Sequence, residues 1–289
     1  MFKGSLPAWV TPVKNGELDY ETLKKLVEWH IGEGSHGFVP VGTTGESPTL
    51  THEEHERVIE VVVEAVAGRV PVIAGAGSNN TLEGIRLIQH AERVGADAAL
   101  VVTPYYNKPT QQGLFEHFQA VARAVNLPII LYNVPGRTGC DLLNDTVVRL
   151  SQIDNIVAIK DATGDVERGA ALIEAVPDGF SVFSGDDATA LELMRRGGKG
   201  NVSVTANIAA GDMAAMCNLA LAQEWEAAAE IDARLSDLNH LLFSEANPIP
   251  VKWAMAHRGM IEEGIRLPLT PLSEGCRAPL EQAMETYFA

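Results

Sequence analysis

Lys160 is the residue whose type and position in this sequence best suit it to chemistry. It ends the strand-like apolar run Asn155–Ile159 and is followed at once by Asp161. Burial disfavours the charged form of an amine, and a neutral amine attacks carbonyl carbons to form a Schiff base. A lone lysine at a strand end more often extends its amine to solvent. Chemistry at Lys160 is therefore favoured only if further polar groups converge on it.

Polar and glycine-rich segments follow the other apolar runs, each at the point where the run ends. If the runs are parallel strands of a barrel, these segments meet on one rim, where the active sites of such folds form. The segments are Gly42–Glu46, Gly75–Asn79, Pro104–Asn107, Tyr132–Gly139 and Ser184–Asp187. We therefore expect polar and aromatic groups to surround Lys160.

Tyr132 and Arg137 are the two side chains of this rim whose chemistry best fits a reactive amine. A tyrosine at a strand end can shuttle protons, or it can fill the rim as a packing residue. An arginine in a Gly-Arg-Thr-Gly loop can hold a carboxylate, or it can be solvated. The N–H groups and hydroxyls of Gly42–Glu46 can also bind a carboxylate, although a plain glycine-rich turn explains them about as well. The residues by themselves leave these alternatives open.

His52 and His55 invite a metal interpretation that their spacing does not support. They are three residues apart, no third ligand is evident, and the HExxH order of zinc enzymes is absent. Thr51 and Glu54 fit a capping box that opens a helix. Gly75–Gly77 lacks the third glycine of a dinucleotide-binding loop. We therefore predict neither a metal nor a nicotinamide cofactor.

Net charge and cysteine content limit which partners and which cellular compartment are expected. A formal net charge of −16 over 289 residues argues against nucleic acid and anionic membranes as partners. Cys140, Cys217 and Cys276 are widely separated and form no CxxC pair, so neither a disulfide framework nor a zinc site is indicated. The first residues lack the apolar run of a signal peptide, and no stretch approaches a membrane span. We expect a cytoplasmic location.

Short apolar runs alternate with helical patterns through the first two thirds of the chain. This alternation predicts parallel strands with right-handed crossovers. Eight strands in about 205 residues suggest a closed (β/α)8 TIM barrel, with an open doubly wound sheet as the competitor. The strand candidates are Leu6–Val13, Gly37–Val41, Val70–Ala74, Ala98–Thr103, Pro128–Asn133, Ile156–Lys160, Phe180–Ser184 and Asn201–Val204.

Helical patterns lie between these runs and continue beyond Ala206. They include Tyr20–Ile31, Glu53–Val66, Thr81–Val94, Leu114–Val125, Asp187–Arg195, Ile208–Gln223, Trp225–Phe243, Pro248–His257 and Ala278–Phe288. We predict an α/β protein with a barrel domain over residues 1–223 and a C-terminal helical domain over residues 224–289.

Six segments together resemble the dihydrodipicolinate synthase family of the pyruvate-dependent class I aldolase superfamily. The resemblance runs from about Phe2 to the last helix. The segments are Gly42–Ser47, Tyr105–Asn107, Tyr132–Gly139, Ile159–Gly164, Ser184–Asp187 and Asn247–Lys252. The pattern Tyr-Asn-Val-Pro-x-Arg-Thr separates this family from N-acetylneuraminate lyases, which share the lysine but not the arginine. The resemblance implies a (β/α)8 barrel with a C-terminal helical domain.

The resemblance also implies an activity and an assembly. Pyruvate would condense with L-aspartate 4-semialdehyde in lysine and diaminopimelate biosynthesis, with no cofactor beyond the covalent imine. The protein would be a homotetramer, a dimer of dimers. A fixed cation at the rim would offset the acidic surface for two anionic substrates.

Site residues are carried over by motif. Lys160 would form the Schiff base with pyruvate, and Tyr132 would donate and accept protons. Thr44 and Tyr106 would complete the proton relay, Tyr106 from across a tight dimer interface. Thr43 would lie beside the pyruvate carboxylate and belong to the same catalytic set.

Three further residues would contact substrates. Val202 would contact pyruvate through its backbone, at a position where the family often has isoleucine. Arg137 would hold the carboxylate of the semialdehyde, and Gly185 would belong to the substrate-binding set with Thr44.

A second family site would bind L-lysine as a feedback inhibitor at the dimer interface. The matching positions are Ser47, His52, His55, Asn79, Glu83 and Tyr105, while Pro48 departs from the alanine common in inhibited relatives. Matching residues do not by themselves establish coupling between two sites.

Two other functions remain as alternatives. The first is an aldolase that splits a 2-keto-3-deoxy sugar acid or a sialic acid, against which Arg137 and Tyr132–Pro135 argue. The second is a barrel without catalysis that senses small 2-oxo acids.

Overall fold

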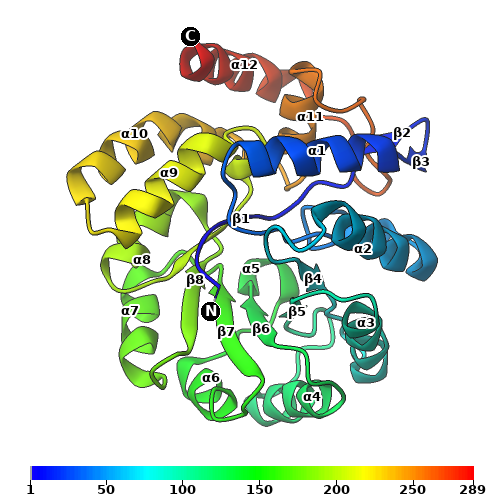
Figure 1. The fold of residues 1–289 in the computed structure, drawn as a ribbon, viewed down its shortest axis with the longest axis vertical. Coiled ribbons are helices and arrows are strands. Elements are labelled where there is room, and N and C mark those ends of the chain that lie inside the picture. Colours follow the sequence, from blue (N-terminus) through cyan, green and yellow to red (C-terminus); the bar gives the residue numbers. More distant parts are fainter. Residues whose placement is uncertain (1) are drawn as a thin grey trace.

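The computed structural model describes residues 2–289 and contains a curled sheet of seven parallel strands surrounded by helices (Figure 1). The strands are β1 (Gly4–Pro7), β4 (Ile73–Gly75), β5 (Ala98–Val102), β6 (Ile129–Asn133), β7 (Ile156–Asp161), β8 (Ser181–Ser184) and β9 (Gly200–Ser203). Their order is β1-β9-β8-β7-β6-β5-β4. A separate antiparallel pair joins β2 (Val13–Lys14) to β3 (Glu17–Leu18).

The segment 38–40 lies between β1 and β4, the two edge strands of this sheet. Its bridges pair Val39 with Ala8 and Phe38 with Val72. Val39 N–H donates to the Pro7 carbonyl at 3.0 Å, and Ile73 N–H donates to the Phe38 carbonyl at 2.8 Å. The prediction of a strand over 37–41 was therefore too long. The backbone leaves the extended region at Val41, whose φ is 50°.

The first predicted strand, 6–13, was also wrong in its extent. β1 ends at Pro7, and Val13 belongs to the hairpin of β2 and β3. The run is apolar apart from Thr11, and its residues Trp9, Val10 and Val13 are buried in the core although they lie outside the strands of the parallel sheet.

Twelve α-helices are present between residues 2 and 289, and most lie around the outside of the strands (Figure 1). They are α1 (Tyr20–Gly32), α2 (His52–Val66), α3 (Thr81–Arg93), α4 (Gln111–Arg123), α5 (Pro135–Thr138), α6 (Asn144–Leu150), α7 (Val166–Ala175), α8 (Ala190–Arg195), α9 (Ala210–Leu221), α10 (Trp225–Leu241), α11 (Ile249–His257) and α12 (Glu274–Phe288). The short 3-10 helices are η1 (Ser47–Thr49), η2 (Asp187–Thr189) and η3 (Thr205–Asn207).

Local sequence signals explain several of these boundaries. The capping box predicted at Thr51 and Glu54 is confirmed, because each side chain accepts the other residue's backbone N–H at the start of α2. The predicted helix over 187–195 is divided into η2 and α8, since Asp186 caps the former. Arg137 was expected in a loop but lies in the one-turn helix α5.

Buried side chains form two layers. One cluster comes from the strands and their ends and includes Leu6, Ile130, Tyr132 and Val202, with no helical member. This cluster therefore fills the inside of the curl. The larger cluster lies between the strands and the helices. Successive strand residues point to opposite faces, so the same strands supply both layers.

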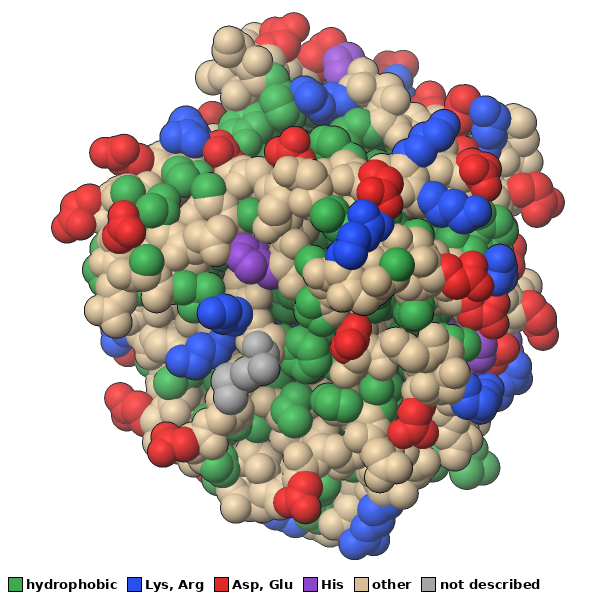
Figure 2. All heavy atoms as spheres, in the orientation of Figure 1, with side chains coloured by type: hydrophobic (Ala, Val, Ile, Leu, Met, Phe, Trp, Pro, Cys, Tyr) green, Lys and Arg blue, Asp and Glu red, His purple; other side chains and the backbone are tan. Residues whose placement is uncertain are grey.

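The helices after β9 pack on one another. α10 contacts α8, α9 and α12, and α11 contacts α12 and η3. Within residues 2–289, no helix is both long and apolar enough to cross a bilayer. On the face drawn in Figure 2, charged side chains of both signs lie mostly toward the periphery, and apolar ones gather near the middle.

Candidate active site

Tyr132 and Lys160 are direct neighbours across the pair of strands β6 and β7. Their Cα atoms are register partners, and each residue is 6% exposed. The Lys160 Nζ lies 4.3 Å from the centroid of the Tyr132 ring. The sequence placed both residues at strand ends, and the sheet brings them into contact on the inner face.

Gly185 packs against the stem of Lys160. A Cβ atom at this position would lie 2.7 Å from Lys160 Cε and 2.8 Å from Ala162 Cβ. Real Cβ atoms essentially never approach other heavy atoms this closely. Only glycine therefore leaves room for the extended lysine side chain that reaches the tyrosine ring.

A cavity of about 530 Å³ opens at the end of the sheet where β4, β5 and β6 finish. The surface that lines it is mainly apolar and carries a few polar groups, as is usual for small-molecule sites. Eight of the residues predicted from sequence line it: Thr43, Ser47, His52, His55, Glu83, Tyr105, Tyr132 and Arg137. Lys160 adjoins the cavity through Tyr132, which lines it.

The turn over residues 42–46 borders this cavity, and some of its backbone N–H groups donate no hydrogen bond within the described residues. Gly45 and Glu46 donate their N–H groups within the turn, to Gly42 and Thr43. In the part of the chain that the structure describes, no hydrogen bond uses the N–H groups of Thr43 and Thr44. Two adjacent free N–H groups beside a cavity can hold a carboxylate.

Asn247 joins two of the predicted site residues and was given no role from sequence. Its side-chain amide donates to Thr44 Oγ1 at 2.9 Å, and its carbonyl accepts a hydrogen bond from Arg137 at 3.2 Å. Asn247 is 5% exposed and precedes α11. The only sequence signal for it is its place in the matching segment Asn247–Lys252. No hydrogen bond joins Thr44 to Tyr132 among the described residues.

Five of the six residues matched to the second site line the same cavity: Ser47, His52, His55, Glu83 and Tyr105. His52 Nε2 lies 3.1 Å from Glu83 Oε1, and Asn79 donates to the Tyr105 carbonyl at 3.1 Å. Burial lowers the pKa of His55 to about 4. This histidine is therefore neutral near pH 7. Asn79 itself does not line the cavity.

Tyr106 and Val202, like Thr44 and Gly185, are not among the residues that line this cavity. Tyr106 is 89% exposed, whereas Lys160 is 6% exposed, and no hydrogen bond of the Tyr106 hydroxyl is present among the described residues. Val202 is 2% exposed and packs inside the sheet in the cluster that contains Tyr132. Within residues 2–289, no group of three His, Cys, Asp or Glu residues is placed to hold a metal ion.

Comparisons with known proteins give a consistent result over the full length. Residues 1–287 match the model of the Dihydrodipicolinate synthetase family. The 4-hydroxy-tetrahydrodipicolinate synthase of Marinobacter nauticus is 58% identical, over 99% of this chain and 98% of the relative.

Solved structures agree with the sequence comparisons. A chloride-inhibited dihydrodipicolinate synthase from Acinetobacter baumannii, solved with pyruvate, is similar with a TM-score of 0.98 and 55% identity. That match covers 100% of this chain and 99% of the other. A dihydrodipicolinate synthase from Cyanidioschyzon merolae with lysine bound has a TM-score of 0.96 at 41% identity, over 99% and 98% of the two chains.

Proposed function

The chain belongs to the dihydrodipicolinate synthetase family, and we propose that it condenses pyruvate with L-aspartate 4-semialdehyde, as a Schiff-base-forming lyase of lysine and diaminopimelate biosynthesis. The observation that carries the proposal is the contact between Lys160 and Tyr132. A buried amine lies 4.3 Å from the centre of a buried phenol ring beside a cavity. An amine with an adjacent proton donor and acceptor is what imine chemistry requires.

Lys160 attacks the carbonyl carbon of pyruvate and loses water to form an imine. The protonated imine withdraws electrons, so a methyl proton is lost and an enamine forms. The enamine carbon then attacks the aldehyde carbon of the second substrate. Tyr132 donates and accepts the protons of these steps, and Thr44 with Tyr106 of a second copy completes the relay.

Substrate carboxylates are held at two places. The N–H groups of Thr43 and Thr44 take the carboxylate of pyruvate, beside the backbone of Val202. Arg137, exposed at the cavity rim, takes the carboxylate of the semialdehyde through paired hydrogen bonds. Gly185 contributes to substrate binding indirectly, because its missing side chain leaves space for Lys160.

The fold is proposed to be a closed (β/α)8 TIM barrel with a C-terminal helical domain. Closure is supported by the segment 38–40, which bridges both edge strands. A barrel over residues 1–223 and a helical domain over residues 224–289 are supported by the turn at Gln223, with φ of 63°, immediately before α10.

The assembly is proposed to be a homotetramer, a dimer of dimers. Tyr105 and Tyr106 are exposed aromatic residues, which suits an interface through which Tyr106 enters a neighbouring site. No metal or organic cofactor is needed, because the imine itself supplies the electron sink. Nucleic acid and membrane are not expected partners, and a cytoplasmic location stays a prediction from sequence.

L-Lysine is proposed as an effector that binds at Ser47, His52, His55, Asn79, Glu83 and Tyr105. The related protein with lysine bound supports this proposal, as does the presence of five of these six residues in the lining of one cavity. Its test is a lysine titration of the initial rate. An unchanged rate at millimolar lysine contradicts it.

Borohydride reduction in the presence of pyruvate tests the central proposal. We expect a mass gain on the peptide that contains Lys160, and no gain in Lys160→Ala. Lys24→Ala, which removes an exposed lysine of α1, is the matched control and should keep the adduct. Absence of an adduct in the wild type rules out the mechanism. Assays with 2-keto-3-deoxy sugar acids and sialic acid separate this activity from those of other aldolases.

A further inference from the structure

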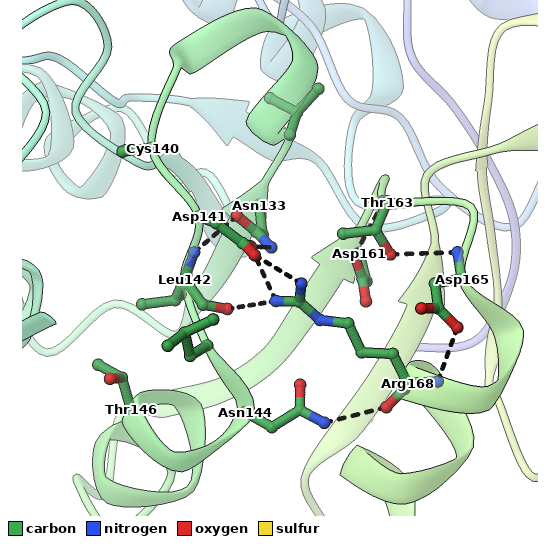
Figure 3. A network of polar contacts seen from close by, with 12 residues as sticks. Asn133, Cys140, Asp141, Leu142, Asn144, Thr146, Asp161, Thr163, Asp165 and Arg168 are labelled. Atoms are coloured by element: carbon green, nitrogen blue, oxygen red, sulfur yellow. Dashed lines mark hydrogen bonds and ion pairs between the residues drawn. The ribbon is translucent and has the colours of Figure 1, made fainter.

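A polar network lies beside the ends of β6 and β7 (Figure 3). Its strand residues Asn133 and Asp161 directly follow Tyr132 and Lys160, so their side chains point to the opposite face of the sheet. At the centre of the network, Arg168 in the first turn of α7 donates two hydrogen bonds to Asp141, at 2.7 and 2.8 Å. It donates a third to the Leu142 carbonyl at 2.7 Å. Paired bonds from a guanidinium to a carboxylate fix both the distance and the angle between the groups.

One arm of this network ends at the residue after Tyr132. The side-chain amide of Asn133 donates to Asp141 at 2.9 Å, and its oxygen accepts the N–H of Leu142 at 3.0 Å. Asn133 is fully buried. Arg168 therefore holds the end of β6 through Asp141.

Asp161, the residue after Lys160, is influenced by the charge of Arg168 without a hydrogen bond between them among the described residues. Asp161 is 6% exposed and accepts the N–H of Thr163 at 3.0 Å. Burial raises the pKa of Asp161, while its hydrogen bonds to Thr163 and the charge of Arg168 act in the opposite direction. Arg168 is therefore hydrogen-bonded to Asp141, and its positive charge also favours the ionised form of Asp161, whereas the charge of Asp141 disfavours it.

Asn133 and Asp161 are the two members of one register pair of β6 and β7, and the preceding pair is Tyr132 with Lys160. Because successive strand residues point to opposite faces, an outward anchor at one position sets the inward side chain at the position before it. We propose that Arg168 is a positioning residue, which keeps Tyr132 and Lys160 in the geometry that imine formation needs. This inference rests on the proposed function.

Arg168→Gln tests the proposal. We expect borohydride-trapped pyruvate adduct to form at least about 10-fold more slowly, with kcat lowered to match, since small misplacements of reacting groups are costly. The aldehyde KM should change by less than about 2-fold, because this network lies on the face of the strands away from the cavity. The double variant Asp141→Asn/Arg168→Gln should recover part of the rate, because one of the two carboxylates is then neutral.

Arg196→Gln is the matched control, since Arg196 pairs with Glu167 of α7 at 2.7 Å but is remote from β6 and β7. It should trap pyruvate at the wild-type rate. If Arg168→Gln melts earlier yet traps pyruvate at the wild-type rate, Arg168 is structural only and the proposal is overturned. Should Arg168→Gln not fold, Arg168→Lys keeps the charge without the paired bonds, and a wild-type trapping rate in it overturns the proposal equally. A wild type that traps no pyruvate defeats the proposed function first.

Discussion

Glu46 and Lys252 form an ion pair whose side chains are 1% and 4% exposed, although 206 positions separate them in the sequence. The pair joins the turn that carries Thr43 and Thr44 to α11. The Lys252 amine also donates to the Thr11 carbonyl at 3.2 Å, and Glu46 accepts the N–H of Arg266 at 3.0 Å. The C-terminal helices therefore hold a turn of the candidate site through a buried pair of charges.

Lys252→Met should lower the free energy of unfolding by about 3–5 kcal/mol, because it leaves the Glu46 carboxylate buried without its partner. Urea unfolding at neutral pH measures this loss. The double variant Glu46→Gln/Lys252→Met removes both charges and should lose distinctly less. Equal losses in the single and double variants would show that the pairing of the charges is not what matters.

Gly185→Ala should reduce kcat by about 100-fold, because a misplacement of roughly 1 Å near the reacting groups has this effect. The added methyl group would lie 2.7 Å from Lys160 Cε, so the amine must move. Steady-state kinetics check this prediction. Gly136→Ala is the matched control, since a Cβ there meets nothing within 4 Å, and its kcat should stay at the wild-type value.

Arg137→Ala should keep the borohydride-trapped pyruvate adduct but raise the KM for the semialdehyde. Hydrogen bonds to a charged group contribute about 1.5–3 kcal/mol, which corresponds to a KM raised about 10- to 100-fold. Initial rates at saturating pyruvate measure it. Arg93→Ala, an exposed arginine of α3, should leave this KM unchanged. An unaltered KM in Arg137→Ala would refute the assigned role.

Acidification should destabilise the protein between about pH 6.5 and 3 through His30. Burial lowers the pKa of this fully buried histidine from 6.5 to about 3. Below pH 6.5 the unfolded chain binds a proton that the folded chain does not. The stability that neutral His30 contributes to the folded state is therefore fully present above pH 6.5 and is lost as the pH falls toward 3. At pH 5 this loss lowers the free energy of unfolding by about 2 kcal/mol.

His30→Gln removes this titrating group, so its unfolding free energy should fall by about 2 kcal/mol less than the wild type's between pH 7 and pH 5. Urea unfolding at the two pH values measures the difference. His55 and His117, with pKa values lowered to about 4 by burial, contribute with the same sign in both proteins. Equal falls in the two proteins would exclude His30 as a source.

Local patterns predicted most of the fold. The helices from α1 to α4 and the strands from β5 to β9 begin and end within a few residues of their predicted bounds, because periodic apolar positions and caps such as Thr51 act over short distances. The one-turn helix α5 was missed, since four residues carry too little periodicity. The predicted first strand extended too far beyond the end of β1, because buried residues outside a strand are apolar in sequence just as paired strand residues are.

The sequence by itself determined which elements form and that polar residues follow the strands, since both depend on neighbours along the chain. It therefore placed Lys160 and Tyr132 at strand ends and Arg137 in the loop that follows one of them. Only the tertiary structure decided that Tyr132 and Lys160 are register partners, and that Asn247 holds Thr44 across 203 positions. Strand register and contacts of this range depend on how the whole sheet curls and packs, and no local pattern of residues encodes that geometry.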